Sequence, residues 1–463
     1  MSRHRLADSR RAVRHRESTP RVMNGALILL ALVTGGLLSW IWHGRVQPDD
    51  WASLWIGGML VEGGQGAHLY DHHPEDFSAM SGQPWLDAAA QVPSPFPHPF
   101  VQNPLVAYAI ALLTKVMSFE ASVTWLLFLS GFCLVVLVAS AYNLWFRSTM
   151  PWGIAAVAVA AVSTLPTTIN SLWLGQTTPL IVAGVAYGIA ASRSRPWLAG
   201  ILLGIVAMVK LTPIALIVVM AFFASRRLTA YWGAGTAVLL GASTWLFVDS
   251  HIVSTWLERI SEIGSAVLVG PVNQSLASII ASESVGATYL VTVAENYPAS
   301  AKLLPAILAL VMTLIAVAVA WWNRKFRFEI LIVSAWGIAI AFSSIVWTHY
   351  MLSLVLFATG FIAMSGSRLT RQWPYLGVAG LVVLLSFPVT NPIAATPMTA
   401  GFAYSGITAM IGAGVFLVAV GALHAAATNH VNRAEPMVLF DAVSRVVKRG
   451  RMRAPDGEQV TKA

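Results

Sequence analysis

Long apolar stretches dominate the pattern of hydrophobic and polar positions along the chain. They lie at residues 23–42, 122–146, 152–169, 178–192, 196–225, 228–248, 303–322, 329–346, 350–366, 374–391 and 404–426. A helix of about 20 apolar residues spans the ~30 Å hydrocarbon core of a bilayer. A shorter stretch, 104–116, would give a helix of only about 20 Å and is better explained as interfacial or re-entrant. The pattern predicts an all-α polytopic membrane protein.

The stretch 196–225 differs from the others, each of which is counted as one membrane span. It is too long for one ordinary span and too short for two full ones. Pro213 lies near its middle, where proline breaks a helix. We therefore expect a short helical hairpin that turns at Lys210-Leu211-Thr212-Pro213, which brings the expected number of membrane helices to twelve.

The low fraction of charged residues supports a membrane protein, and their distribution along the chain indicates its topology. Only 11% of the residues are charged, against roughly 25% in soluble domains. Basic clusters near both ends, rather than a basic groove, account for the net charge of +9, so they indicate topology and contacts with anionic membrane lipids, not nucleic-acid binding. The first stretch reads as a retained signal anchor.

Excess Lys and Arg mark cytoplasmic loops, which predicts that both termini are cytoplasmic. All Lys and Arg then lie inside except Lys210, within the membrane, and Arg45, Lys115, Arg259 and Lys302 outside. The expected organisation is a basic tail at 1–22, one membrane domain at 23–426 with outside loops at 43–121 and 249–302, and a basic tail at 427–463.

Unusual polar residues collect on the outer face. Asp49 and Asp50 follow the first apolar stretch; they could be a solvated pair that caps a helix, or one of them could be a general base. His349, in Trp347-Thr348-His349-Tyr350, could belong to an interfacial aromatic belt or contact a phosphate. Trp347, Tyr350 and Asp49 are possible accessory residues.

Lys210 is the least easily dismissed cation, because an ammonium at membrane depth costs on the order of 3 kcal/mol. It could snorkel to the interface or bind a lipid-linked phosphate. Gln176, Asn273 and Gln274 carry amides suited to sugar hydroxyls. His68, His72 and His73 match no strong metal-ligand spacing, so no metal is expected. Cys133 is the only cysteine, which excludes an intrachain disulfide.

Several short motifs, taken in order, resemble glycosyltransferase family 87. They are the run from Asp50-Trp51-Ala52 to Gly57-Gly58, then Leu69-Tyr70-Asp71, Gly175-Gln176, Lys210-Leu211-Thr212-Pro213, Asn273-Gln274-Ser275-Leu276 and Trp347-Thr348-His349-Tyr350. The resemblance implies a GT-C fold and an inverting sugar transfer from a polyprenyl-phosphate donor, most often mannose, to a lipid-anchored glycan at the periplasmic face of a bacterial plasma membrane. It implies Asp50 as the base, and His349, Lys210 and Gln176 beside the donor, with no cofactor.

Two departures fall on the acceptor side. The Tyr-Pro-Pro common in the family is replaced by Pro99-Phe100-Val101-Gln102-Asn103-Pro104, and the tyrosine that usually follows the catalytic Asp is Leu54 or Trp55. An arabinofuranosyltransferase that uses polyprenyl-phosphate arabinose is the alternative within the family. A lipid or solute transporter is the alternative from another class, although transporter sites usually lie near the bilayer midplane.

Overall fold

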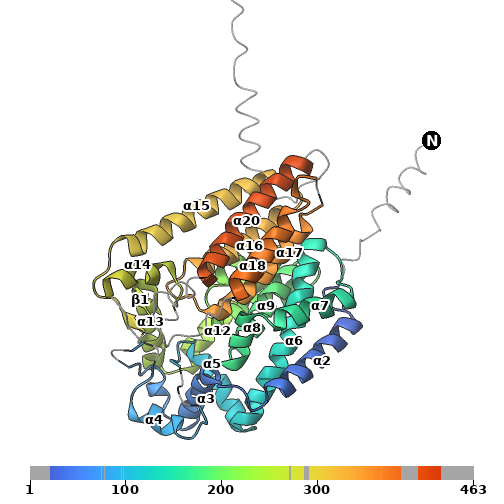
Figure 1. Ribbon diagram of the computed structural model, residues 1–463. Coiled ribbons are helices and arrows are strands. Elements are labelled where there is room, and N and C mark those ends of the chain that lie inside the picture. Colours follow the sequence, from blue (N-terminus) through green and yellow to red (C-terminus); the bar gives the residue numbers. More distant parts are fainter. Residues whose placement is uncertain are drawn as a thin grey trace, which may run out of the picture.

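Helices make up nearly all of the architecture (Figure 1). The computed structural model describes residues 21–73, 76–77, 79–94, 96, 98–270, 273–285, 291–366, 368–386 and 405–428. Nearly all of both predicted tails, and the predicted outer turn at 388–404, lie outside these described residues. The chain is an all-α polytopic membrane protein.

Four described helices are long and apolar enough to cross a membrane, or five if one bent pair is a single span. The four are α2 (Gly25–Trp42), α6 (Phe119–Phe146), α15 (Ser300–Trp322) and α20 (Ser405–Thr428). Side-chain caps fix two of the starts: Asn24 accepts from the amide of Leu27 at α2, and Ser118 accepts from that of Ala121 at α6. The total of twelve membrane helices stays a prediction.

The predicted apolar span at 152–169 is bent. It divides into α7 (Trp152–Ser163) and α8 (Pro166–Trp173), which meet at an angle of 70°. Proline disfavours the helical conformation of the residue before it, and Leu165 is extended, with φ −67° and ψ 138°. The bend directs the end of α8 towards α3.

The predicted break at 210–213 is present. It lies between α10 (Pro196–Val209) and α11 (Ile214–Ala221), and α9 (Thr178–Ala191) and α12 (Arg227–Phe247) pack against α10. Glycines bring α10 and α12 together: a Cβ on Gly204 would lie 2.6 Å from the carbonyl oxygen of Gly233, and one on Gly200 would lie 2.5 Å from that of Thr229. Small residues at such a crossing let membrane helices approach closely.

The two outside segments fold into short elements at one end and one side of the helical bundle (Figure 1). The first contains α3 (Asp49–Glu62), η1 (Gly66–His68), α4 (Gln83–Ala89) and α5 (Pro104–Thr114). The second contains α13 (Ser250–Ser265), β1 (Leu268–Val269), α14 (Leu276–Val285) and β2 (Thr292–Val293), with β1 and β2 paired antiparallel. Helix α5 packs on α3 and is short, as predicted.

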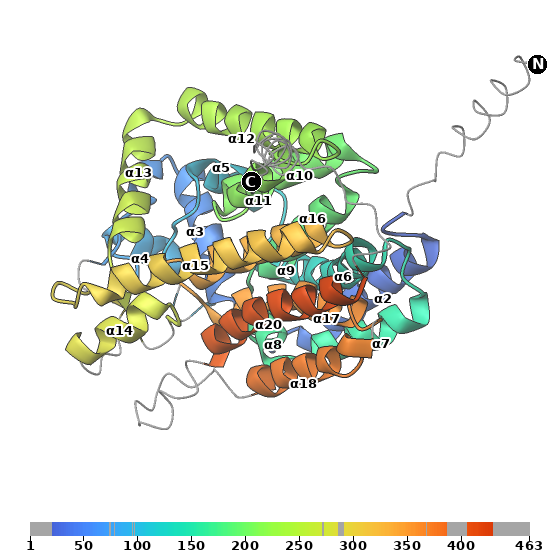
Figure 2. The ribbon, with the colours of Figure 1, turned by 90° about the horizontal axis from the view of Figure 1, so that it is seen from above.

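The remaining elements complete the bundle. They are α16 (Arg327–Ala341), η2 (Thr348–Ser353), α17 (Leu354–Ala363), η3 (Arg368–Thr370) and α18 (Trp373–Ser386). Figure 2 shows α10, α11 and α12 along one side and α18 on the other, with α15, α16 and α20 between them. Helix α6 links the ends of the molecule: the Trp51 indole of α3 donates to Ser122 near its start, and Arg147 at its end pairs with Glu329 at 3.0 Å.

Candidate active site

The two acidic residues occupy the first turn of α3 and do not cap it. Pro48 is the N-cap and makes no side-chain cap bond, and Asp49 is buried, with 4% of its surface exposed. A solvated capping pair is therefore wrong for this structure. The amide of Asp50 donates to the carbonyl of Leu174 at 3.1 Å, which ties the start of α3 to the end of α8.

A turn at Gly175 allows the start of α3 to pack closely against the end of α8. Gly175 has φ +63°, a conformation that suits glycine, and a Cβ there would lie 2.8 Å from the Cβ of Pro48. The next residue, Gln176, has its amide side chain beside the Asp50 carboxylate, where it helps to lower the pKa of that group. The structure thus brings together Asp50 and Gln176, which are far apart in the sequence.

Ser94 and His98 hold the two carboxylates, and the sequence reasoning missed both of them. The Ser94 hydroxyl donates to Oδ1 of Asp49, and the Nδ1 atom of His98 lies 2.8 Å from Oδ1 of Asp50. Ser53, one turn after Asp49, donates its hydroxyl to the carbonyl of His98. In the sequence, the feature that could have indicated His98 is its position among prolines and phenylalanines in the first outside loop. Only the fold shows that it contacts the Asp50 carboxylate.

Opposite effects act on the two neighbouring carboxyls. Burial raises the pKa of Asp49 despite the Ser94 hydrogen bond. Burial would also raise the pKa of Asp50, but the charge and hydrogen bond of His98 outweigh it, so that this pKa is lowered. Burial would lower the pKa of His98, and Asp50 raises it instead. Of the two, Asp50 is therefore the carboxyl whose lowered pKa favours the ionised form that a general base requires.

A lysine and two η2 residues interact with this carboxylate. Lys210 lies at the C-terminal end of α10, and its Nζ is 3.4 Å from the ring centroid of Tyr350, a close cation–π contact. The His349 ring meets the Tyr350 ring edge-on at 4.8 Å. Asp50 interacts electrostatically with both Lys210 and His349.

Two features of this group fit an anionic ligand. Lys210 and Tyr350 line a small cavity together with Thr178, Thr212 and Ser343. Buried His349 has an Nδ1 atom without a hydrogen-bond partner among the described residues. Lys210 likewise forms no ion pair in the described part of the chain. Both can therefore donate to a phosphate.

Asn273 and Gln274 hold the segment that leads to η2. The Asn273 amide donates to the carbonyls of Leu268 and Ser344, and its oxygen accepts from the amide of Val346. Gln274 donates to the Thr348 hydroxyl at 2.9 Å and keeps a buried oxygen with no partner among the described residues. Trp347 is half-buried at the N-cap of η2. These side chains position His349, and Gln274 keeps one free acceptor.

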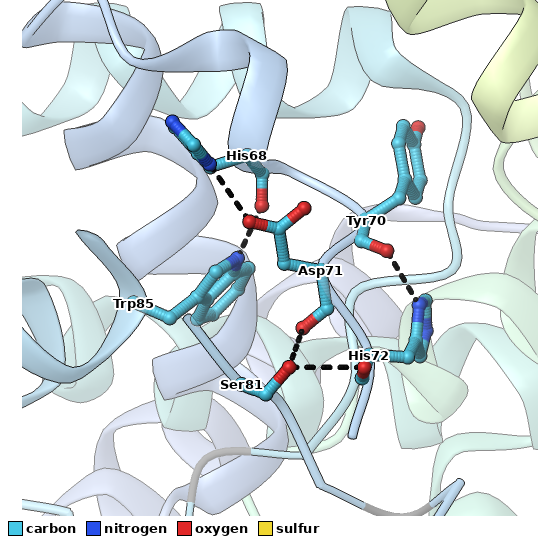
Figure 3. Close-up of polar contacts among 6 residues, drawn as sticks. All are labelled: His68, Tyr70, Asp71, His72, Ser81 and Trp85. Atoms are coloured by element: carbon cyan, nitrogen blue, oxygen red, sulfur yellow. Dashed lines mark hydrogen bonds and ion pairs between the residues drawn. The ribbon is translucent and has the colours of Figure 1, made fainter. Parts of the chain in front are cut away.

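The other loop histidines form a separate cluster (Figure 3). The Nδ1 atom of His68 lies 2.7 Å from Oδ2 of Asp71, and the Trp85 indole donates to the carbonyl of His68. The Nδ1 atom of His72 lies within hydrogen-bond distance of the Tyr70 carbonyl, and the Ser81 hydroxyl donates to the carbonyl of His72. Throughout the residues that the structure describes, no three His, Cys, Asp or Glu side chains gather in a way that could hold a metal ion.

A comparison with models of protein families identifies the family of the chain. The model of glycosyltransferase family 87 matches residues 100–344, more than half of the chain. The matched region contains Gln176, Lys210, Asn273 and Gln274, whereas Asp50 and His349 lie outside it. A search of curated proteins finds no match.

Proposed function

Because the chain belongs to glycosyltransferase family 87, we propose that it moves a sugar, mannose in the first instance, from a polyprenyl-phosphate donor to a lipid-anchored glycan. The reaction takes place at the outer face of a bacterial plasma membrane, with Asp50 as the general base. One observation carries this proposal: the Oδ2 atom of Asp50 is buried and, among the described residues, has no hydrogen-bond partner. The Asp50 carboxylate interacts electrostatically with Lys210 and with His349.

The proposed step is a single displacement. An acceptor hydroxyl attacks the anomeric carbon of the donor, and its proton passes to Oδ2 of Asp50. The bond from the anomeric carbon to the phosphate oxygen breaks, and its electron pair leaves with the polyprenyl phosphate. Attack from the face opposite the leaving group inverts the anomeric centre, as in other single-displacement sugar transfers.

Charge grows on the leaving phosphate in the transition state, and two groups are placed to stabilise it. The Lys210 ammonium provides a positive charge in the cavity beside Tyr350. His349 provides a ring nitrogen that no described group occupies. A preorganised cation and a ring N–H donor of this kind would support the departure of the phosphate without a metal ion, and the reaction then needs no further cofactor.

Gln176 and Gln274 are the proposed contacts to sugar hydroxyls. Gln176 lies beside Asp50, where the reacting end of the acceptor would be. Gln274 retains its unpartnered oxygen. Asn273 contributes by positioning, because both ends of its amide bind backbone groups. Membrane lipids surround the site, and both substrates reach it from the bilayer.

The identity of the sugar separates the two candidates within the family. The purified protein in lipid nanodiscs would be given radiolabelled polyprenyl-phosphate mannose or polyprenyl-phosphate arabinofuranose, together with a bacterial lipid extract. We expect a labelled lipid product from the mannose donor; product from the arabinose donor alone would favour the arabinofuranosyltransferase. A transporter would give no labelled product from either.

The base assignment is tested by Asp50→Asn. This change removes the proton acceptor and leaves a side chain of the same shape, so we expect transfer to fall by about 10²- to 10⁴-fold. The matched control is Asp87→Asn, at an exposed acidic residue in the same outside loop that hydrogen-bonds Gln83. It should keep the wild-type rate. Wild-type transfer by Asp50→Asn would reject the assignment.

A further inference from the structure

His98 binds one oxygen of the Asp50 carboxylate and leaves the other unoccupied. Its Nδ1 atom is 2.8 Å from Oδ1, while buried Oδ2 has no partner among the described residues. The position of His98 is itself fixed, because Ser53 of α3 donates to its carbonyl oxygen. Helix α3 thus carries both the carboxylate and the anchor of the histidine that binds it.

We propose that His98 is the positioning residue of the base: it holds Oδ1 of Asp50 and thereby directs Oδ2 at the incoming acceptor hydroxyl. The inference rests on the proposed function, in which Asp50 accepts the proton of that hydroxyl. His98 does not touch the substrate. It acts through Asp50, by fixing the orientation of the carboxylate and by keeping the carboxylate ionised until the acceptor arrives.

The charges around the pair favour its ionic form. Asp49 and Asp76 act on His98 in addition to Asp50, and all three favour the protonated imidazole. His349 and Lys210 act on Asp50 from η2 and from the end of α10 and favour the carboxylate. The phenol of Tyr350 also faces Asp50. Between the acid and alkaline limits the pair is therefore Asp50⁻ with His98⁺.

A second pair in the same loop has the same chemistry and provides the control. His68 and Asp71 join Nδ1 to Oδ2 at 2.7 Å (Figure 3). Their side chains are 44% and 37% exposed, against 31% and 22% for His98 and Asp50. Water screens the more exposed pair, and no described contact joins it to Lys210 or His349. A general effect of removing a loop histidine would appear at both positions.

The test compares pH profiles of transfer for wild type, His98→Asn and His98→Leu. Asparagine places its Nδ2 donor as many bonds from the backbone as Nδ1 of histidine, so it keeps the hydrogen bond without the charge. The probe is short-chain polyprenyl-phosphate mannose, in nanodiscs that contain bacterial lipid extract. Loss of an adjacent opposite charge raises a carboxyl pKa by roughly 1–3 units. We expect the acid limb of kcat/KM for the acceptor to move up by about one pH unit in His98→Asn and further in His98→Leu.

Two expected results support the inference, and two contrary results separate its failure from that of the proposed function. His68→Asn should keep the wild-type profile, and the KM for the donor should change less than twofold in His98→Asn. A folded His98→Asn with a lower rate but an unmoved acid limb would overturn the proposal, because packing alone would explain it. Full activity of Asp50→Asn would instead overturn the proposed function, so the two failures are distinguishable.

An NMR titration without substrate tests the charge coupling between His98 and Asp50 even if the protein does not use polyprenyl-phosphate mannose. Histidine labelled with ¹³C and ¹⁵N in its ring gives one NMR signal that is absent from His98→Asn, which assigns it to His98. It should titrate above the ordinary histidine value of ~6.5 in the wild type and at lower pH in Asp50→Asn. Equal midpoints in the two proteins would show that the pair carries no charge coupling and would overturn the proposal.

Discussion

At the residue scale, the charged side chains of the site differ in how readily they can be identified from the sequence alone. Lys210 could be predicted from sequence because an ammonium in an apolar stretch stands out against its neighbours. His98 could not, because a histidine in a polar loop has no such contrast, and its partner lies 48 residues away in the chain. Asp50 lies between these cases: motif spacing selected it, and the structure adds the physical reason, which is that burial acts on Asp49 and His98 acts on Asp50.

Lys210→Met should abolish phosphate stabilisation without destabilising the fold. Methionine keeps much of the volume and removes a buried charge, so thermal stability should hold or rise. Transfer should fall by about 100-fold, as when one preorganised donor is removed. Lys302→Met is the control, since Lys302 also lies over a tyrosine ring, that of Tyr297 at 5.1 Å, but in the second outside segment. Equal losses of activity in both variants would argue against a special role for Lys210.

At the element scale, proline positions explain both a success and a failure of the sequence analysis. The break at Pro213 was predicted because the stretch around it is too long for a single helix. The break at Pro166 was overlooked because residues 152–169 have an ordinary length for one span, and the local conflict at Leu165 was outweighed by that length. Both breaks serve the site: one ends α10 at Lys210, and the other carries α8 to its contact with Asp50.

Gly204→Val should disturb the site through the crossing of α10 and α12. The new side chain would meet the Gly233 carbonyl and Thr236, and overpacking of this kind costs about 1–3 kcal/mol. We expect a lower unfolding temperature and reduced transfer, since α10 carries Lys210. Gly235→Val, on α12, is the matched control because a Cβ there meets nothing within 4 Å. A variant at Gly204 as stable as that control would show that the close approach is unimportant.

At the scale of the whole molecule, the sequence predicted the class correctly, whereas the total of twelve spans and the location of the polar residues on the outer face stay predictions. Several helices that pack near the site are too short to cross a bilayer alone, among them α9, α10 and α17. Hydropathy counts apolar residues, whereas the length of each helix depends on where prolines and buried polar residues interrupt it. The tertiary contacts of α3 with α8 could not be predicted, because they join backbone groups.

Cysteine labelling tests the predicted orientation. Cys133, the only native cysteine, is replaced by serine, and single cysteines are introduced at Asp87 of α4 or at Arg324 between α15 and α16, both exposed. A membrane-impermeant maleimide should label the cysteine at 87 in intact cells and that at 324 only after permeabilisation. Labelling of both sites, or of 324 alone, in intact cells would contradict a periplasmic site with cytoplasmic termini.

The joint between α3 and α8 has a consequence for substrate choice. Asp50, the proposed base, belongs to a predicted outside loop, and its backbone amide is bonded to the end of α8, where a Cβ on Gly175 would lie 2.8 Å from that of Pro48. If α8 lies in the membrane, as its apolar stretch predicts, this joint fixes the height of the Asp50 carboxylate relative to the bilayer. In the proposed reaction, the acceptor glycan is held in the membrane by its lipid anchor. Only a hydroxyl at the height of the Asp50 carboxylate can react. The joint between α3 and α8 would therefore select the acceptor hydroxyl by its distance from the membrane.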